Sequence, residues 1–190
     1  MPFQEDRLKA IQVAKTKIQR QPVYLDTETT GLGNRDEIVE ISILDHNGSL
    51  LFDSLVCPTR KIPADAIAIH GITDEMVQGA PQWIEIWPEV QAILQDRELA
   101  IYNADFDIRM IQQTHSIHRQ AGEYLPRDYF CVMRLYAQFK GDWNYSRRSY
   151  QWHSLENAGR QCRIPLPNTH RARDDAALAR AVLYYIAESE

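Results

Sequence analysis

The sequence predicts an α/β fold built on a mixed five-stranded sheet with helices on both faces. Three apolar segments with strand-like alternation fall within residues 23–56, and helical and strand-like patterns then alternate to the end of the chain. The first pattern is typical of antiparallel strands, and the second is typical of strands joined through helices. With 190 residues, the chain is long enough for one domain with a substantial core.

The elements follow from local patterns in chain order. Residues 4–19 are predicted as an amphipathic helix, because Leu8, Ile11 and Ile18 recur at helical spacing. Strands are expected at 23–26, 38–44 and 50–56, and the turn at 46–48 (His-Asn-Gly) indicates a hairpin between the last two. The later elements are a helix at 84–94, a strand at 99–102, a helix resuming at 108–111, a strand at 129–132 and a helix at 174–187. We divide the chain into an N-terminal helix (1–20) and the rest of one domain (21–190).

Composition places the chain among ordinary globular proteins, with 25% charged and 44% apolar residues. No apolar run approaches the roughly 20 residues that a membrane span needs, and the N-terminus lacks the order of a secretory signal. The three cysteines, Cys57, Cys131 and Cys162, are widely spaced and indicate reduced thiols. We therefore expect a cytoplasmic protein that has no membrane partner.

Charge is distributed unevenly along the chain. The net charge is −5, yet residues 129–173 carry eight Lys/Arg and two Asp/Glu, a local charge of +6, together with eight aromatic residues. Basic groups between flat rings suit the phosphates and bases of a single strand. An alternative is that several of these rings belong to the core. Within the window we interpret residues 143–150 as a binding loop, in which Arg147 and Arg148 contact phosphates and Trp143 or Tyr150 stacks on a base.

Acidic residues occur where predicted elements begin or end. Asp26 and Glu28 stand at i and i+2 at the end of a strand, so both side chains point to the same side. Such a pair repels itself unless a cation lies between the carboxylates, and oxygen ligands at this spacing suit Mg²⁺ or Mn²⁺. The other candidates lie where two helices begin: Asp105, Asp107, His170, Asp174 and Asp175. Of these, Asp105 is interpreted as a helix N-cap.

The motifs around these residues resemble those of the DEDDh 3′–5′ exonucleases, the family of the proofreading subunit of bacterial DNA polymerase III, over about residues 23–187. The first motif is matched at 26–32 (Asp-Thr-Glu-Thr-Thr-Gly-Leu) and the second at 103–107 (Asn-Ala-Asp-Phe-Asp). The third, His-x4-Asp, is matched by His170 and Asp175, and a further family segment lies at 69–76. The resemblance identifies Asp107 rather than Asp105, and Asp175 rather than Asp174, as the catalytic acids.

This resemblance implies a ribonuclease H-like fold, an exonuclease domain at 21–190 and two divalent ions, Mg²⁺ or Mn²⁺, in the site. Asp26, Glu28 and Asp175 would hold the ion that activates water, and Asp26 with Asp107 would hold the other. His170 would act as the general base. The residues implied to enclose the 3′-terminal nucleotide are Thr27, Gly31, Leu32 and His70, with Leu32 against its base and Asn103 near the scissile phosphate.

The implied activity is metal-dependent hydrolysis from the 3′ end of single-stranded nucleic acid, with DNA favoured, to give nucleoside 5′-monophosphates. The alternatives are an oligonucleotide or RNA 3′-end-trimming nuclease, a non-catalytic binding module and a polymerase-associated proofreading subunit. The intact set of acids argues against the binding module. The chain stops 15 residues after Asp175 with no visible tether, so the sequence favours a free-standing nuclease. Association with a polymerase through the N-terminal helix stays open.

Overall fold

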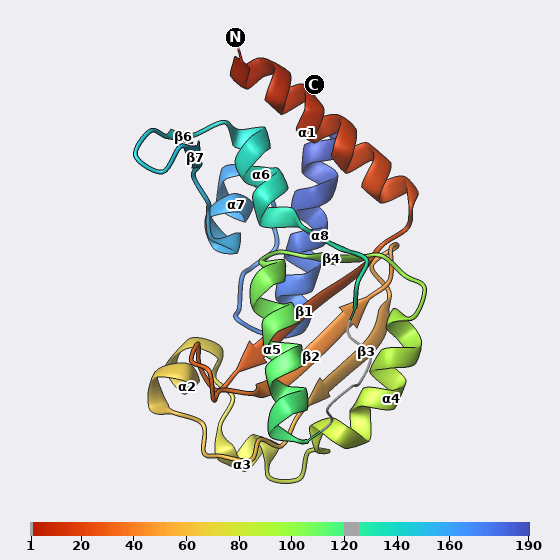
Figure 1. The fold of residues 1–190 in the computed structure, drawn as a ribbon, viewed down its shortest axis with the longest axis vertical. Coiled ribbons are helices and arrows are strands. Elements are labelled where there is room, and N and C mark those ends of the chain that lie inside the picture. Colours follow the sequence, from red (N-terminus) through yellow and green to blue (C-terminus); the bar gives the residue numbers. More distant parts are fainter. Residues whose placement is uncertain (1, 120–125) are drawn as a thin grey trace.

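The computed structural model describes residues 2–119 and 126–190. At its centre is a five-stranded sheet in the order β3-β2-β1-β4-β5, and the β6-β7 hairpin lies apart from it (Figure 1). The strands are β1 (Val23–Thr29), β2 (Ile38–Leu44), β3 (Leu50–Leu55), β4 (Leu99–Ile101), β5 (Tyr129–Cys131), β6 (Trp143–Asn144) and β7 (Ser149–Tyr150). The helices are α1 (Pro2–Gln19), α2 (Ala64–His70), α3 (Asp74–Val77), α4 (Trp83–Leu94), α5 (Ala104–Ile117), α6 (Val132–Lys140), α7 (Leu155–Gln161) and α8 (Ala172–Glu188).

The pairing of the sheet follows from the connections between its strands. β2 pairs antiparallel with both β1 and β3. The β2–β3 turn closes with a hydrogen bond from Gly48 N to Asp45 O (2.9 Å), and the φ of 89° at position 48 favours glycine. β4 pairs in parallel with β1, and β5 pairs in parallel with β4, because helices connect them. The predicted mixed five-stranded sheet is confirmed.

Helices cover both faces of the sheet, and each face has its own core. On one face α1, α6 and α8 contribute Ile11, Tyr136 and Val182 to a common cluster. On the other face α4 and α5 contribute Trp87 and Met110. β2 is buried along its whole length. The stripe predicted for the last helix is buried in the first cluster, as expected, at Leu178, Val182 and Ile186.

The first helix packs through most of its predicted face. Ile11 is buried in the first cluster with Ala10 and Ala14, and Ile18 packs against the same cluster, whereas Leu8 is 60% exposed. At 3.6 residues per turn, Leu8 stands about 120° from Ala14 around the helix axis, beyond the edge of the buried stripe. The prediction that Leu8 belongs to this stripe is wrong.

Several elements are present that the sequence patterns did not predict: α2, α3, α6, α7 and the β6-β7 hairpin. Most are short, and α6 begins directly after β5 with no turn signal between them. Tyr136 and Phe139 on α6 are buried, so these two rings of the basic window belong to the core. The N-cap prediction for Asp105 is also wrong, because α5 begins at Ala104 and its N-cap position is Asn103.

None of the helices within residues 2–119 and 126–190 has both the length and the apolar character that crossing a membrane requires.

Candidate active site

Side chains from three distant parts of the sequence converge on one pocket. Asp26 and Glu28 come from β1, Asp107 from the first turn of α5, and Asp175 from the first turn of α8. His170 lies in the loop before α8. All five line a pocket of about 240 Å³, with the remaining wall formed by Thr27, Tyr102, Asn103, Phe106, Ser154, Leu155, Glu156 and Asn168. The structure therefore brings together the five residues predicted as catalytic.

The acids next to these in the sequence have other contacts. Asp105 forms a surface ion pair with Arg134. Asp174 accepts a hydrogen bond from Thr169 Oγ1 at 2.7 Å. Neither lines the catalytic pocket. Of each neighbouring pair of acids, Asp107 and Asp175 are the ones that line the pocket.

The carboxylates of the pocket are hard to ionise together. Burial, with smaller contributions from Asp175, Glu40 and Asp107, raises the pKa of Glu28 to about 8. Burial raises the pKa of Asp107 to about 7 and that of Asp175 to about 6. Burial and then Asp107 raise the pKa of Asp26 well above its usual range. A positive charge in the pocket would favour the ionised form of every one of these groups.

The donor set fits a divalent cation. Ligand atoms of Glu28, His170 and Asp175 lie within 4.8 Å of one another. Asp175 Oδ1 is buried and has no hydrogen-bond partner among the residues that the structure describes. A buried carboxylate oxygen without a partner is costly, and coordination would satisfy it. Carboxylate-rich sites of this kind suit Mg²⁺ or Mn²⁺.

Hydrogen bonds fix the orientation of two of the acids. Thr27 Oγ1 donates to Asp107 Oδ1 at 2.7 Å, so the threonine between Asp26 and Glu28 orders the acid of α5. Asn168 Nδ2 donates to Asp175 Oδ2 at 2.7 Å, which leaves Oδ1 directed elsewhere. The sequence analysis did not identify Asn168. No local pattern marks it, because its role depends on a contact seven positions along the chain.

An ion pair between the buried Glu40 and the half-exposed Arg171 anchors the start of α8. Arg171 Nε donates to both carboxylate oxygens of Glu40, at 3.0 and 3.1 Å, and its Nη2 also contacts Oε1. The backbone N–H of Ala172 donates to Glu40 Oε2 at 2.9 Å. We call these contacts the Glu40–Arg171 clasp. The sequence analysis missed it, although a carboxylate in the middle of the apolar strand 38–44 was a usable signal.

A second hollow adjoins the catalytic pocket. It has a volume of about 370 Å³ and contains Gly31, Leu32 and His70 in its wall, and it shares Thr27 and Glu28 with the catalytic pocket. We call it the Leu32 hollow. The Leu32 side chain is 78% exposed, so it is free to contact a ligand.

His70 is held as part of the wall of this hollow. Its Nδ1 accepts from Ile72 N at 3.0 Å, and its Nε2 lies 3.2 Å from the carbonyl oxygen of Thr29. Both ring nitrogens are therefore engaged within the protein, with Nε2 as the protonated atom. Burial lowers the pKa of His70. Contact with a ligand is left to the face and edge of its ring.

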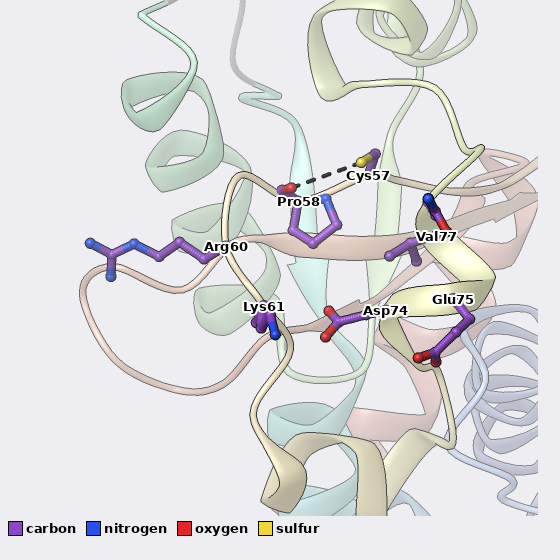
Figure 2. Close-up of a pocket in the computed structure, with 8 residues that line it drawn as sticks. Cys57, Pro58, Arg60, Lys61, Asp74, Glu75 and Val77 are labelled. Atoms are coloured by element: carbon purple, nitrogen blue, oxygen red, sulfur yellow. Dashed lines mark hydrogen bonds between the residues drawn. The ribbon is translucent and has the colours of Figure 1, made fainter.

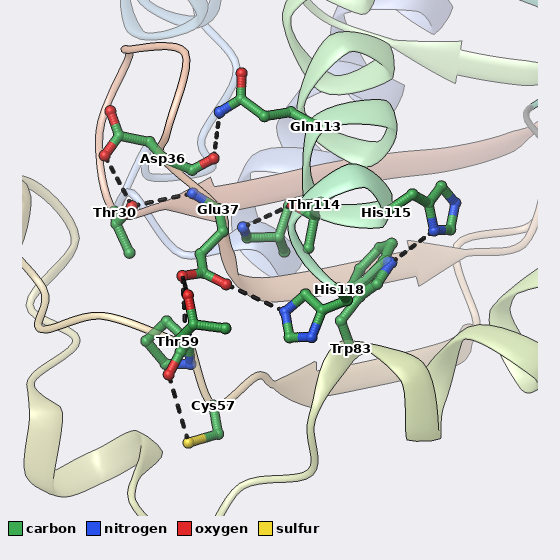
Figure 3. Close-up of polar contacts among 12 residues, drawn as sticks. Thr30, Asp36, Glu37, Cys57, Thr59, Trp83, Gln113, Thr114, His115 and His118 are labelled. Carbon is green, nitrogen blue, oxygen red and sulfur yellow. Dashed lines mark hydrogen bonds and ion pairs between the residues drawn. The ribbon is translucent and has the colours of Figure 1, made fainter. Parts of the chain in front are cut away.

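Hydrogen bonds hold the backbone of the loop that carries Leu32, and Figure 3 shows those around Asp36 and Glu37. Asp36 accepts from Thr30 Oγ1 at 3.0 Å and from Gly33 N at 2.6 Å. Gln113 of α5 donates to Gly33 O at 3.0 Å. At the base of the loop, the buried Glu37 accepts from Thr59 and lies 3.2 Å from His118 Nε2. Leu32 is thus an exposed side chain on a supported backbone.

The predicted phosphate-binding arginines lie on the β6-β7 hairpin, outside the catalytic pocket. Arg147 and Arg148 are both exposed. Arg147 lines a hollow of about 410 Å³ with Tyr150 and Trp152, and we call this the hairpin pocket.

The aromatic rings of the hairpin differ in how they are packed. Trp143 and Tyr150 pack edge to face at 5.1 Å and both contact Phe3 of α1. Tyr150 also donates to Asp6 Oδ2 at 2.6 Å. Both rings are half-buried, and stacking of either one on a base stays a prediction. Trp152 is 58% exposed and lines the hairpin pocket, whereas Tyr145 is 81% exposed and lines neither that pocket nor the catalytic pocket.

A further pocket, of about 350 Å³, lies between the loop after β3 and helix α3 (Figure 2). Its wall carries both signs of charge, with Lys61 and Arg60 against Asp74 and Glu75. The Asp74 carboxylate is engaged within the protein, because its Oδ1 accepts a hydrogen bond from Ile62 N at 2.9 Å. The pocket contains none of the residues predicted as functional.

Comparisons with known proteins point to one family. The RNase_T family, described as exonuclease, matches residues 23–183. The chain is 37% identical over 182 residues to the uncharacterized exonuclease CP81 of Escherichia phage 186, covering 93% of each chain. It is 32% identical to the DNA polymerase III subunit epsilon of Treponema pallidum (strain Nichols), covering 80% of this chain and 69% of that one. The structure of exonuclease X in complex with 5′ overhanging duplex DNA superposes with a TM-score of 0.65 and 27% identity, covering 86% and 89% of the two chains.

Proposed function

We propose that this chain, which belongs to the RNase_T exonuclease family, shortens single-stranded 3′ ends by a two-metal mechanism. It is a 3′–5′ exonuclease of the DEDDh group with a ribonuclease H-like fold. The observation that carries the proposal is the convergence of Asp26, Glu28, Asp107, Asp175 and His170 on one pocket. A second support is the buried, unpartnered oxygen of Asp175, which the family's divalent ions would satisfy.

Asp26, Glu28 and Asp175 would hold one Mg²⁺ or Mn²⁺, and Asp26 with Asp107 would hold the other. Such ions would supply an activated water and stabilise charge at phosphorus and on the leaving oxygen. Thr27 keeps Asp107 in place through its hydroxyl, and Asn168 does the same for Asp175.

His170 takes the proton of the attacking water. Its side chain is exposed, and a ring nitrogen lies within 4.8 Å of ligand atoms of Glu28 and Asp175. A neutral imidazole at physiological pH has the basicity for this step. The departing product is a nucleoside 5′-monophosphate, because the bond to the 3′ oxygen breaks.

The 3′-terminal nucleotide occupies the Leu32 hollow. The backbone near Thr27 and Gly31 faces its sugar, Leu32 contacts its base, and the ring of His70 closes the wall. Asn103 lies near the scissile phosphate in the adjoining pocket. Arg147 and Arg148 contact phosphates further along the strand.

Digestion of 5′-labelled DNA and RNA oligonucleotides with Mg²⁺, with and without a complementary strand, tests the proposal. We expect stepwise shortening from the 3′ end and release of nucleoside 5′-monophosphates, fastest on single-stranded DNA. Asp175→Asn should abolish turnover, and the matched control Asp174→Asn should leave it within a few-fold of wild type. Equal loss in both variants, or products that carry a 3′-phosphate, contradicts the assignment. Faster digestion of RNA favours the RNA-trimming alternative.

Association with a polymerase is a second candidate role, supported by the similarity to a DNA polymerase III subunit. Co-elution with a bacterial replicative polymerase subunit on size exclusion tests it, and separate elution at micromolar concentration contradicts it. The three free cysteines support a cytoplasmic location for either role.

A further inference from the structure

A short segment of backbone joins the catalytic pocket to the hairpin pocket. Trp152 lines the hairpin pocket, and Ser154 lines the catalytic pocket. Two residues apart, their Cα atoms are separated by at most about 7 Å. We call residues 151–154 the strap.

The strap is held firmly by the protein. Gln151 N donates to Asp142 O at 2.7 Å. Tyr102 Oη donates to the carbonyl oxygens of His153 and Ser154, at 3.0 and 3.3 Å. Ser154 Oγ accepts from Asn157 N at 3.2 Å and so caps α7. The exposed ring of Trp152 therefore projects from a fixed backbone.

The Leu32 hollow, the catalytic pocket and the hairpin pocket follow one another in this order. The Leu32 hollow shares Thr27 and Glu28 with the catalytic pocket, and the strap leads from that pocket to the hairpin pocket. With the terminal nucleotide in the Leu32 hollow and the scissile phosphate at the acids, the rest of the strand leaves over the strap. This direction rests on the proposed function.

The hairpin pocket has the chemistry of a nucleotide site. Trp152 is 58% exposed, and Arg134 lies 6.0 Å from the centre of its ring. Arg147 lines the same pocket, with the amide side chains of Asn144 and Gln151 beside it. The nearby carboxylates are partly engaged, since Asp105 pairs with Arg134 and Asp142 lies 3.3 Å from His153 Nε2. An unpaired base stacks on such a ring while its phosphate meets the arginine.

We propose that the hairpin pocket binds a nucleotide of the unpaired 3′ segment, the third or fourth from its end, with its base on Trp152 and its phosphate at Arg147. In a stacked strand each nucleotide advances about 3.4 Å, so the separation between Ser154 and Trp152 spans about two nucleotides beyond the scissile phosphate. The enzyme thereby selects substrates with at least three or four unpaired nucleotides at the 3′ end.

A length series tests this site. Oligothymidylates of two to eight nucleotides are digested with Mg²⁺, and kcat and KM are measured for the first cleavage. In wild type, KM should fall roughly 5–100-fold between the dinucleotide and the pentanucleotide, the usual effect of one stacked base, and then level off. Trp152→Ala should remove this gain while leaving kcat on the dinucleotide unchanged, and Trp152→Phe should retain most of it.

Tyr145→Ala is the matched control, because Tyr145 is an exposed ring of the same hairpin that lines neither pocket. It should behave as wild type at every length. Trp152→Ala with an unchanged length dependence overturns the proposal, as does an equal loss on the dinucleotide or an equal effect on a blunt duplex. Failure of the proposed function is distinguishable, because wild type would then cleave no oligothymidylate of any length.

Discussion

Among single residues, His170 combines the proposed role of general base with an unusual backbone conformation. Its φ is 53°, in the left-handed region that residues other than glycine adopt at a cost. The residues on either side hold it there, because Thr169 contacts Asp174 and Arg171 is bound to Glu40. The exposed imidazole is thus presented by a backbone that its neighbours constrain.

Replacing His170 with alanine or glycine separates these two features. Both variants should lose roughly 10²–10⁴-fold in kcat, the usual contribution of a general base. His170→Gly should be more stable than His170→Ala by about 1 kcal/mol, because glycine accepts a positive φ. Urea unfolding compares the stabilities, and single-turnover kinetics compare the rates. Equal stability of the two variants would show that the left-handed backbone carries no strain.

Stability without metal should fall as pH rises, and the stabilisation by metal should grow. The folded pKa values of Glu28, Asp107 and Asp175, about 8, 7 and 6, lie above those of an unfolded chain. The metal-free fold therefore binds protons more tightly, and its stability should fall as pH rises from about 4 to about 8. Bound Mg²⁺ would stabilise the ionised form of these buried carboxylates, so its effect on Tm should be larger at pH 8 than at pH 5.5.

Thermal unfolding in EDTA and in Mg²⁺ at these two pH values measures the effect. Asp107→Asn serves as the control, because it removes one repelling carboxylate and should be less sensitive to both pH and metal. A metal-induced shift in Tm that is the same at both pH values would contradict this interpretation.

At the scale of elements, the start of α8 is the junction on which the site depends most. The Glu40–Arg171 clasp ties this helix to β2, and Glu40 is the register partner of Glu28 on β1. One buried carboxylate therefore links the strand that carries Asp26 and Glu28 to the helix that carries Asp175. Displacing the clasp would move Asp175 and His170 together.

Arg171→Met should lower both activity and stability. We expect about a tenfold or larger loss in kcat on long and short substrates alike, because misplacement affects the chemical step. We also expect a loss of about 1–3 kcal/mol in the free energy of unfolding, because the buried Glu40 loses its charged partner. Arg171→Lys should restore part of both. Arg173→Met, at an exposed position of the same helix, is the control, and an equal effect there would rule out a specific role for the clasp.

At the scale of the whole molecule, the two ends of the chain pack against each other. α1 and α8 lie side by side on one face of the sheet, with α6 beside them (Figure 1). Lys17 of α1 and Arg20, just after this helix, also pair with Glu98, which directly precedes β4. The first helix therefore belongs to the same core cluster as α6 and α8.

Paired substitutions on α1 measure this packing. Ile11→Ala should destabilise the protein by about 2–4 kcal/mol, because the side chain is 6% exposed and its loss leaves a cavity. Leu8→Ala should change stability by less than about 0.5 kcal/mol, because that side chain is 60% exposed. Urea unfolding followed by circular dichroism gives both values. Similar losses at the two positions would mean that Leu8 is packed against the core as Ile11 is.

The sequence by itself determined the sheet and the five residues of the catalytic pocket. Alternation of apolar residues is a local property, so it located β1, β2 and β3 closely. The turn at 46–48 indicated the hairpin of β2 and β3. The five residues were identifiable because each lies in a short motif whose residue types and spacing are visible in one stretch of chain. They converge because the C-terminal end of β1 and the first turns of α5 and α8 meet at one edge of the sheet.

Only the tertiary structure decided which polar and aromatic residues support that pocket. The clasp joins residues 131 positions apart, and Tyr102 fixes a strap 51 positions away, so no local pattern encodes either contact. The tertiary structure also decided which aromatic residues of the window 129–173 belong to the core, since Tyr136 is buried while Trp152 is exposed. Sequence periodicity reports which side of an element is apolar. What that side meets depends on the packing of distant elements, and this packing completes the site.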